Sequence, residues 1–224
     1  LDGAVPAGPM DNGLLPIDLE DQNFNDLILK IMRRCDQTPV CQSRLQEYGE
    51  NAVDVLKGTY AKLDDGALCP SMAAIFDRTA LHQKLAQLVA DYYGRMLVPA
   101  LLYRINRCNR ADVDAVTTLF EPKKDDDKLF NENLNANIIV SELIGGSSLK
   151  EAKRFSDRAY ASPDETLQQY KRRAVADWPV YSPGTGTHEW PETNMPVLIM
   201  NGSLDPQTPM AYARYGKGFY TGEN

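Results

Sequence analysis

The stretch Asn194-Met-Pro-Val-Leu-Ile-Met-Asn-Gly-Ser-Leu-Asp-Pro-Gln-Thr-Pro209 decides the predicted fold of this chain. Its apolar run Val197-Leu-Ile-Met200 has no polar interruption, which is typical of a parallel β-strand covered on both faces. In open α/β sheets, functional side chains lie beyond the carboxyl ends of the strands, and Asp205 occupies that place here. We therefore predict a strand over 197–201 that presents the Asp205 carboxylate. A second interpretation stays open, in which Asp205 only caps a turn, because Asp-Pro is a common turn dipeptide.

Up to about residue 176 the pattern favours helices. Apolar residues between Phe24 and Met32 recur at i, i+3, i+4, i+7 and i+8, which is one face of an amphipathic helix. Asn109 and Asp112 have the spacing of a capping box, and Ser148 has the same relation to Glu151. Further helices are predicted over 43–57, with Gly58 just past the end, and over 72–78, 79–95, 149–160 and 163–176.

Two segments interrupt this helical pattern. Residues 121–137 are polar and carry a Lys-Lys-Asp-Asp-Asp-Lys run, which predicts a solvated loop. The β-branched run over 138–144 predicts a strand, and Glu142 lies near its end. After the proline-rich segment 177–196 comes the strand at 197–201, followed by a final helix that begins at Pro209.

Composition excludes several classes of function. The chain has 224 residues, 43% of them hydrophobic, and a net charge of -7. Lys and Arg form no stripe, so we expect no nucleic-acid partner. No apolar run approaches the roughly 18 residues that span a bilayer, so no membrane partner is expected either. No cofactor is predicted. The sequence begins at Leu1 and shows no signal-peptide pattern, so we expect its natural N-terminus to be processed away or not included.

The four cysteines leave two interpretations open. None belongs to a Cys-x-x-Cys pair and both histidines are far from them in sequence, so no metal site is predicted. In the first interpretation Cys35–Cys41 and Cys69–Cys108 are disulfides, which implies a secreted or lysosomal type of compartment. In the second, all four are buried free thiols.

The acid-bearing segment carries a family resemblance. It has a proline, an apolar strand, Gly-x-x-Asp and then Pro-x-Thr-Pro, and so resembles α/β-hydrolases of the tripeptidyl and prolyl aminopeptidase type. Weaker similarities lie at Leu1-Asp-Gly3, in the short loop between Cys35 and Cys41, at Tyr103-Arg-Ile-Asn-Arg-Cys108 and at Trp178-Pro179. Val175 departs from the pattern, because the family has a cysteine there.

This resemblance implies a serine exopeptidase that acts on peptide substrates through an acyl-enzyme. Asp205 would be the triad acid that orients a histidine, and the triad order is serine, acid, histidine. The chain has no Gly-x-Ser-x-Gly motif, and no histidine follows Asp205. We therefore expect the nucleophile and the histidine to lie outside the 224 residues, and this chain alone to be inactive. Ser148 is interpreted as a helix cap, His188 as a surface residue and His82 as a packing or solvent-facing residue.

Glu142 is a candidate for substrate binding. In aminopeptidase-like relatives an acid in the lid or cleft holds the α-amine of the substrate through a charge-assisted bond. Because Glu142 follows an apolar run and precedes two glycines, it could face such a cleft. The open alternative is an ordinary exposed glutamate.

The predicted fold class is α/β, a partial α/β-hydrolase fold with a mostly helical lid and a C-terminal strand-turn-helix. Its expected parts are the end of a nucleophile-side sheet over 1–21, a helical lid over 22–137, and the remainder of the lid with a return to the catalytic α/β domain over 138–224. Two further functions stay open: a non-catalytic helical binding or interaction module, which the helical majority favours, and an esterase or lipase type of hydrolase, because one fold hosts many reactions.

Overall fold

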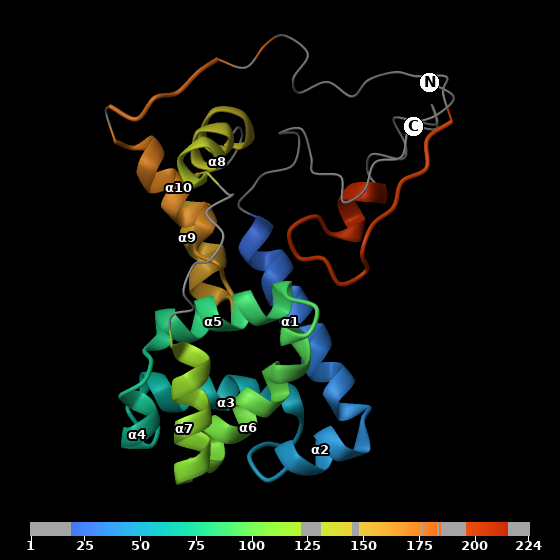
Figure 1. Ribbon diagram of the computed structural model, residues 1–224, viewed down its shortest axis with the longest axis vertical. Helices are drawn as coiled ribbons and strands as arrows, with labels where there is room; N and C mark the ends of the chain where they lie inside the picture. Colours follow the sequence, from blue (N-terminus) through green and yellow to red (C-terminus); the bar gives the residue numbers. More distant parts are fainter. Residues whose placement is uncertain are drawn as a thin grey trace. The chain divides into compact units, whose positions relative to one another are not determined.

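The computed structural model describes residues 19–121, 131–144, 148–175, 177–182, 184 and 196–214. Most of the described residues are helical, and the helices follow one another as Figure 1 shows. They are α1 (Glu20–Asp36), α2 (Pro39–Leu45), α3 (Ala52–Asp64), α4 (Pro70–Ala73), α5 (Arg78–Ala90), η2 (Gly94–Met96), α6 (Leu97–Arg107), α7 (Arg110–Phe120), α8 (Glu132–Ile138), η3 (Ile139–Leu143), α9 (Leu149–Arg158) and α10 (Glu165–Arg173).

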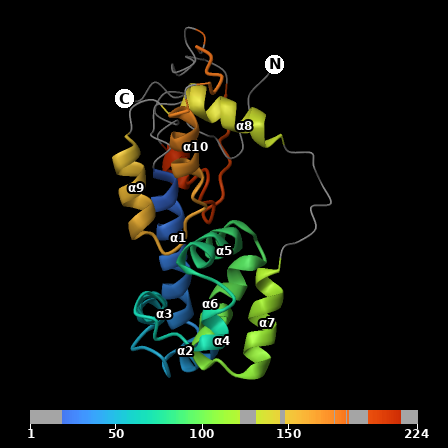
Figure 2. The ribbon, with the colours of Figure 1, turned by 90° about the vertical axis from the view of Figure 1, so that its left-hand side faces the viewer.

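The chain divides into two compact units. Unit 1 comprises Leu1–Asn23, Asp127–Arg158 and Asp164–Asn224, and unit 2 comprises Phe24–Asp126 and Ala159–Pro163. In unit 2, α6 packs against α3, α5 and α7, and both views show these helices together (Figure 1, Figure 2). In unit 1, α10 packs against α9 and η3. The predicted division at residues 21 and 137 stays a prediction.

The prediction of an α/β fold is wrong for the part of the chain that the structure describes. In the segment 197–201 only Val197 and Met200 form isolated bridges, and no sheet is present among the described residues. Leu198 is 60% exposed and Met200 is 50% exposed, so the run is not covered on both faces. A strand is stable only when neighbouring strands satisfy its backbone groups, and the described residues supply no such neighbours. The predicted sheet end over 1–21 falls almost wholly outside the described residues.

The second predicted strand is also wrong. Residues 138–144 continue from α8 into a π-helical turn, Ile139–Leu143. Ile139, Val140 and Ile144 are buried in a cluster with Ala152 and Tyr170, and Leu143 and Trp178 pack against it. Packing of one apolar face against neighbouring helices has overridden the β-propensity of the branched residues. Helix α8 also replaces the end of the loop predicted over 121–137. Asn131 accepts a hydrogen bond from the Leu134 amide at 3.0 Å and so caps the start of α8.

The predicted helix over 43–57 is two helices. Asn51 accepts a hydrogen bond from the Asp54 amide at 3.0 Å, so a new helix, α3, begins at Ala52. Gly58 therefore lies inside α3 instead of after it. The break is explained by this cap, since an Asn side chain that satisfies a free amide at a helix start stabilises the start by about 1 kcal/mol.

Several predicted features are confirmed. The apolar face of α1 is buried, with Ile28 and Met32 fully inside unit 2. The capping box is present, because the Asn109 side chain binds the Asp112 amide and the Asp112 side chain binds the Asn109 amide. Ser148 accepts a hydrogen bond from the Glu151 amide at 3.2 Å and caps α9.

Both expected disulfides are present in unit 2, which decides between the two interpretations of the cysteines. Cys35–Cys41 joins the end of α1 to α2, with the Cα atoms 5.2 Å apart. Cys69–Cys108 joins the start of α4 to the end of α6, with the Cα atoms 6.6 Å apart. The structure contains no free cysteine among the described residues.

Candidate functional site

The Asp205 carboxylate is held by its own turn in unit 1. Its Oδ1 accepts hydrogen bonds from the amides of Gln207 at 2.9 Å and Thr208 at 3.0 Å. Its Oδ2 accepts one from the Thr208 hydroxyl at 2.6 Å. The Asn201 amide group donates to the Thr208 carbonyl at 2.8 Å and closes the turn. The turn-capping interpretation of Asp205 therefore describes its local contacts, while its catalytic role stays a prediction.

Glu142 lies in η3, in unit 1, and accepts a hydrogen bond from the Tyr181 hydroxyl. That hydrogen bond, together with burial, raises the pKa of Tyr181. No hydrogen bond or ion pair joins Glu142 to Asp205 among the described residues. The structure does not bring the two candidate residues into one constellation, and the substrate-binding role of Glu142 also stays a prediction.

His82 is buried in α5 of unit 2 and packs on Tyr60, with the ring centroids 5.0 Å apart. That position confirms the interpretation of His82 as a packing residue. His188 lies outside the described residues.

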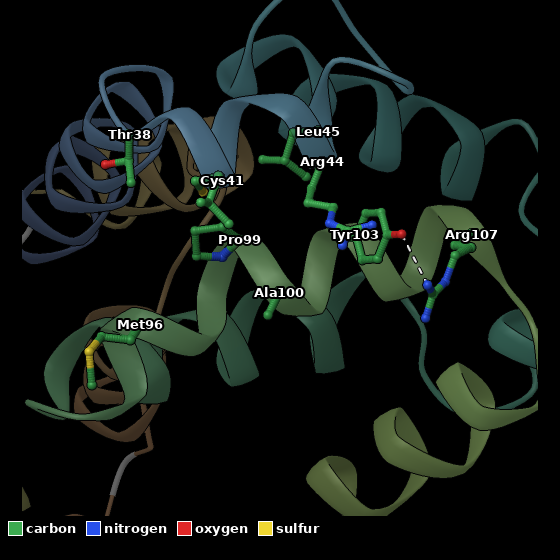
Figure 3. A pocket seen from close by; sticks show the side chains of 10 residues that line it. Thr38, Cys41, Arg44, Leu45, Met96, Pro99, Ala100, Tyr103 and Arg107 are labelled. Atoms are coloured by element: carbon green, nitrogen blue, oxygen red, sulfur yellow. Dashed lines mark hydrogen bonds between the residues drawn. The ribbon is translucent and has the colours of Figure 1, made fainter.

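A cavity of about 460 Å³ lies between α2 and α6 in unit 2 (Figure 3). We call it the α2–α6 pocket. Most of its lining is apolar, and two of the apolar side chains are unusually open to solvent: Val40 is 75% exposed and Met96 is 68% exposed. Ligand sites are typically concave, mainly apolar and a few hundred Å³ in size. The lining residues are Thr38, Val40, Cys41, Arg44, Leu45, Met96, Pro99, Ala100, Tyr103 and Arg107.

The position of α2 follows from local chemistry. Pro39 occupies the first turn of α2, where a missing N–H breaks no helical hydrogen bond. The Cys35–Cys41 disulfide ties this short helix to the end of α1. Leu45 is 2% exposed and anchors the other end of α2 in the core. A helix of this length is marginal alone, so these two anchors hold the wall of the pocket.

One end of the α2–α6 pocket is polar. Figure 3 shows Arg44 reaching from α2 toward the Tyr103 ring, with Met96 at the opposite end of the row. The Arg44 guanidinium lies 6.0 Å from the ring centroid, and that of Arg107 lies 4.6 Å from it. Arg107 Nη1 donates to the Tyr103 hydroxyl at 3.0 Å. The pocket is therefore amphipathic along its length.

Asp112 fixes this polar end from α7. It is fully buried and accepts hydrogen bonds from Arg107 Nε and Nη2, both at 2.7 Å, and from Arg104 Nη1 at 3.0 Å. The Arg107 hydrogen bonds hold the pKa of Asp112 below its usual value, against the opposing effect of burial. The bidentate geometry orients the guanidinium plane of Arg107 beside Tyr103.

Glu20, at the start of α1 in unit 1, is another ionisable residue with a shifted pKa. Burial raises the pKa of Glu20 to about 7, and the nearby charges of Asp21 and Glu165 add to this effect. The Thr166 hydroxyl donates to Glu20 Oε2 at 3.1 Å and acts in the opposite direction. The pKa of Glu20 therefore lies near neutral pH, and Glu20 does not line the α2–α6 pocket.

Sequence reasoning missed the α2–α6 pocket. The apolar segment Val98-Pro-Ala-Leu-Leu-Tyr103 is too short for its periodicity to distinguish a helix from a strand, and it lies within α6. One signal was available: Tyr103 and Arg107 stand four residues apart, the spacing of neighbours on a helix face. Arg44 carried no comparable signal, because only the fold brings α2 beside α6.

Other kinds of site find no support in the described ranges. No three His, Cys, Asp or Glu side chains gather there as a metal site would require. The helices found in those ranges are too short or too polar to cross a bilayer.

The chain matches no protein-family model, no curated protein and no solved structure. Its function therefore has to be inferred from the geometry of its own residues.

Proposed function

We propose that this chain is a helical binding module whose α2–α6 pocket holds an apolar small-molecule ligand. The observation that carries the proposal is a largely apolar cavity of about 460 Å³ whose rim exposes Val40 and Met96 to solvent. Burying apolar surface releases roughly 25 cal/mol for each Å² removed from water, so such a rim favours occupation by an apolar group. The wall is anchored by a disulfide and a buried leucine, so little ordering is needed on binding.

Filling the pocket tests this proposal. Ala100 lines the pocket from the exposed side of α6, so Ala100→Phe adds a ring there without crowding the core. We expect the 224-residue chain to bind the neutral dye Nile red, and Ala100→Phe to weaken that binding at least about tenfold, since a tenfold loss corresponds to 1.4 kcal/mol. Fluorescence titration measures both affinities.

Ala61→Phe is the matched control, because Ala61 is an exposed alanine in the last turn of α3 and does not line the pocket. It should leave the dye affinity unchanged. Equal affinities for the wild-type chain and both variants would show that the dye binds elsewhere, and the proposal would then fail.

A second candidate function is favoured by the geometry of Asp205. We propose that this residue is the acid of a serine peptidase-like hydrolase, with the serine and histidine supplied from outside the 224 residues. A carboxylate accepts about four hydrogen bonds, and the turn uses two at Oδ1 and one at Oδ2. One acceptor position therefore remains at Oδ2, on a carboxylate that is already held in place, for the N–H of a histidine. The resemblance of the segment around Asp205 to aminopeptidase-type hydrolases also supports this proposal.

Labelling with a fluorophosphonate probe separates the two proposals. In the hydrolase proposal, the complete protein that contains this chain reacts with the probe at its serine, and Asp205→Asn slows the reaction because the histidine loses its orienting partner. Asp164→Asn serves as a control in the same unit. A complete protein that does not react, or an Asp205→Asn variant that reacts at the normal rate, would contradict the catalytic role of Asp205.

A further inference from the structure

We propose that the ligand of the α2–α6 pocket is a single-chain amphiphile with a terminal carboxylate, bound with its headgroup at Arg44 and Tyr103 and its tail toward Met96. This inference rests on the proposed function of the pocket and adds the chemical class of the ligand. Three observations carry it. The lining has an apolar end and a polar end, Arg44 has no carboxylate partner among the described residues, and the Tyr103 hydroxyl has a hydrogen available for a ligand.

The lining is separated along the pocket. Val40 and Cys41 of α2, Met96 of η2, and Pro99 and Ala100 of α6 line the pocket, and these side chains carry no charge. Arg44, Tyr103 and Arg107 stand at the other end, as Figure 3 shows. A ligand with one long apolar part and one compact polar part matches both ends of the lining.

The cations at the polar end differ in what they already bind. Arg107 uses Nε and Nη2 on Asp112 and Nη1 on Tyr103. Arg104 also donates to Asp112, so one buried carboxylate serves both arginines. Within the described ranges no carboxylate lies in ion-pair distance of Arg44, which stands over the Tyr103 ring. Arg44 is therefore the pocket cation with its donors still available to an anion.

Tyr103 supplies a second donor. Its hydroxyl oxygen accepts a hydrogen bond from Arg107, and no acceptor for its own hydrogen is present among the described residues. The hydroxyl hydrogen and the Arg44 fork point to an acceptor that can take more than one hydrogen bond, and a carboxylate does so in a planar, bidentate manner. A neutral alcohol has too few acceptor positions to satisfy both groups equally well.

Local charge agrees with an anionic headgroup. The whole chain carries a net charge of -7, yet two arginines, Arg44 and Arg107, line this end of the pocket, and no carboxylate is among the lining residues. The local charge is thus opposite in sign to that of the molecule. A positive site on an acidic protein attracts a small anion that the rest of the surface repels.

Three ligands with the same tail and different headgroups test the inference on the full 224-residue chain. Decanoate, decanol and decylammonium share one tail and differ in headgroup charge. We expect decanoate to displace Nile red with about tenfold higher affinity than decanol, the size of one charge-assisted contact, and decylammonium to bind most weakly. Arg44→Gln should bring decanoate to the affinity of decanol, while Arg44→Lys keeps most of the preference. Arg110→Gln removes an exposed arginine of α7 outside the pocket and should change nothing.

Salt provides a second readout. In about 1 M sodium chloride the Debye length falls to about 3 Å, so the preference for decanoate should shrink while decanol binding persists. If decanol and decanoate bind equally, and both are lost in Ala100→Phe, the pocket binds apolar ligands but the carboxylate inference is wrong. If neither ligand depends on Ala100, the proposed function itself fails. A decanoate preference that survives Arg44→Gln would also overturn the inference.

Discussion

Replacing Cys69 and Cys108 together by serine is expected to lower the free energy of unfolding by about 4 kcal/mol. The bridge connects residues 39 positions apart in the sequence, so it removes a large amount of conformational freedom from the unfolded chain. It also ties the start of α4 to the end of α6, the helix that forms one wall of the pocket. Urea unfolding followed by circular dichroism measures the loss.

The second disulfide is the internal control for this prediction. Cys35 and Cys41 are only 6 positions apart, so the double serine variant should lose about 2 kcal/mol, roughly half as much. This variant should lose more free energy of ligand binding than free energy of unfolding, because it removes the covalent link that holds α2, one wall of the pocket, to α1. Equal losses for the two pairs, or a loss below about 1 kcal/mol for Cys69 and Cys108, would contradict the loop-length explanation.

Asp112→Ala is expected to destabilise the chain by about 3 kcal/mol. The carboxylate is fully buried and joins Arg104 and Arg107 of α6 to the capping box of α7. Removing one partner of a buried ion pair costs about 3–5 kcal/mol. The lower end of that range applies here, because the Arg104 and Arg107 side chains are 41% and 37% exposed and return readily to water. Asp114→Ala, an exposed change on the same helix, should cost much less.

The sign of the pH dependence follows from the lowered pKa of Asp112. A carboxyl group whose pKa is lower in the folded state stabilises the fold above its unfolded pKa, near 3.8, and loses that contribution as the pH falls further. Wild-type stability should therefore decline in this acidic range, and the Asp112→Ala variant should lack that part of the decline. The prediction is contradicted if the difference in stability between wild type and variant stays constant down to about pH 2.

Local signals in the sequence predicted local structure well. The apolar period between Phe24 and Met32 gave α1, and the Asn109 and Asp112 spacing gave the start of α7, because both depend on residues within one or two turns. The disulfide pairs were also anticipated as one of two interpretations. In each of these cases the residues that decide the structure are close in sequence or carry a specific chemistry.

The structure predictions were wrong where residues distant in sequence determine the local structure. Apolar runs at 138–144 and 197–201 have the composition of strands, yet a strand forms only with neighbours that composition does not reveal. In the first run, packing against Ala152 and Tyr170 produced a helical turn. The α2–α6 pocket escaped prediction for the same reason, since Arg44 and Tyr103 meet only after α2 is tied to α1 and packed on α6.

The most direct test of the central claim is where a bound decanoate lies on the 224-residue chain. Intermolecular nuclear Overhauser effects between decanoate and the methyl groups of the protein give that location. We predict contacts from the decanoate tail to the methyl groups of Val40, Met96 and Ala100, which line the α2–α6 pocket. Contacts confined to other exposed apolar residues, such as Tyr92 and Leu198, or no contacts at saturating ligand, would contradict a binding site in the α2–α6 pocket.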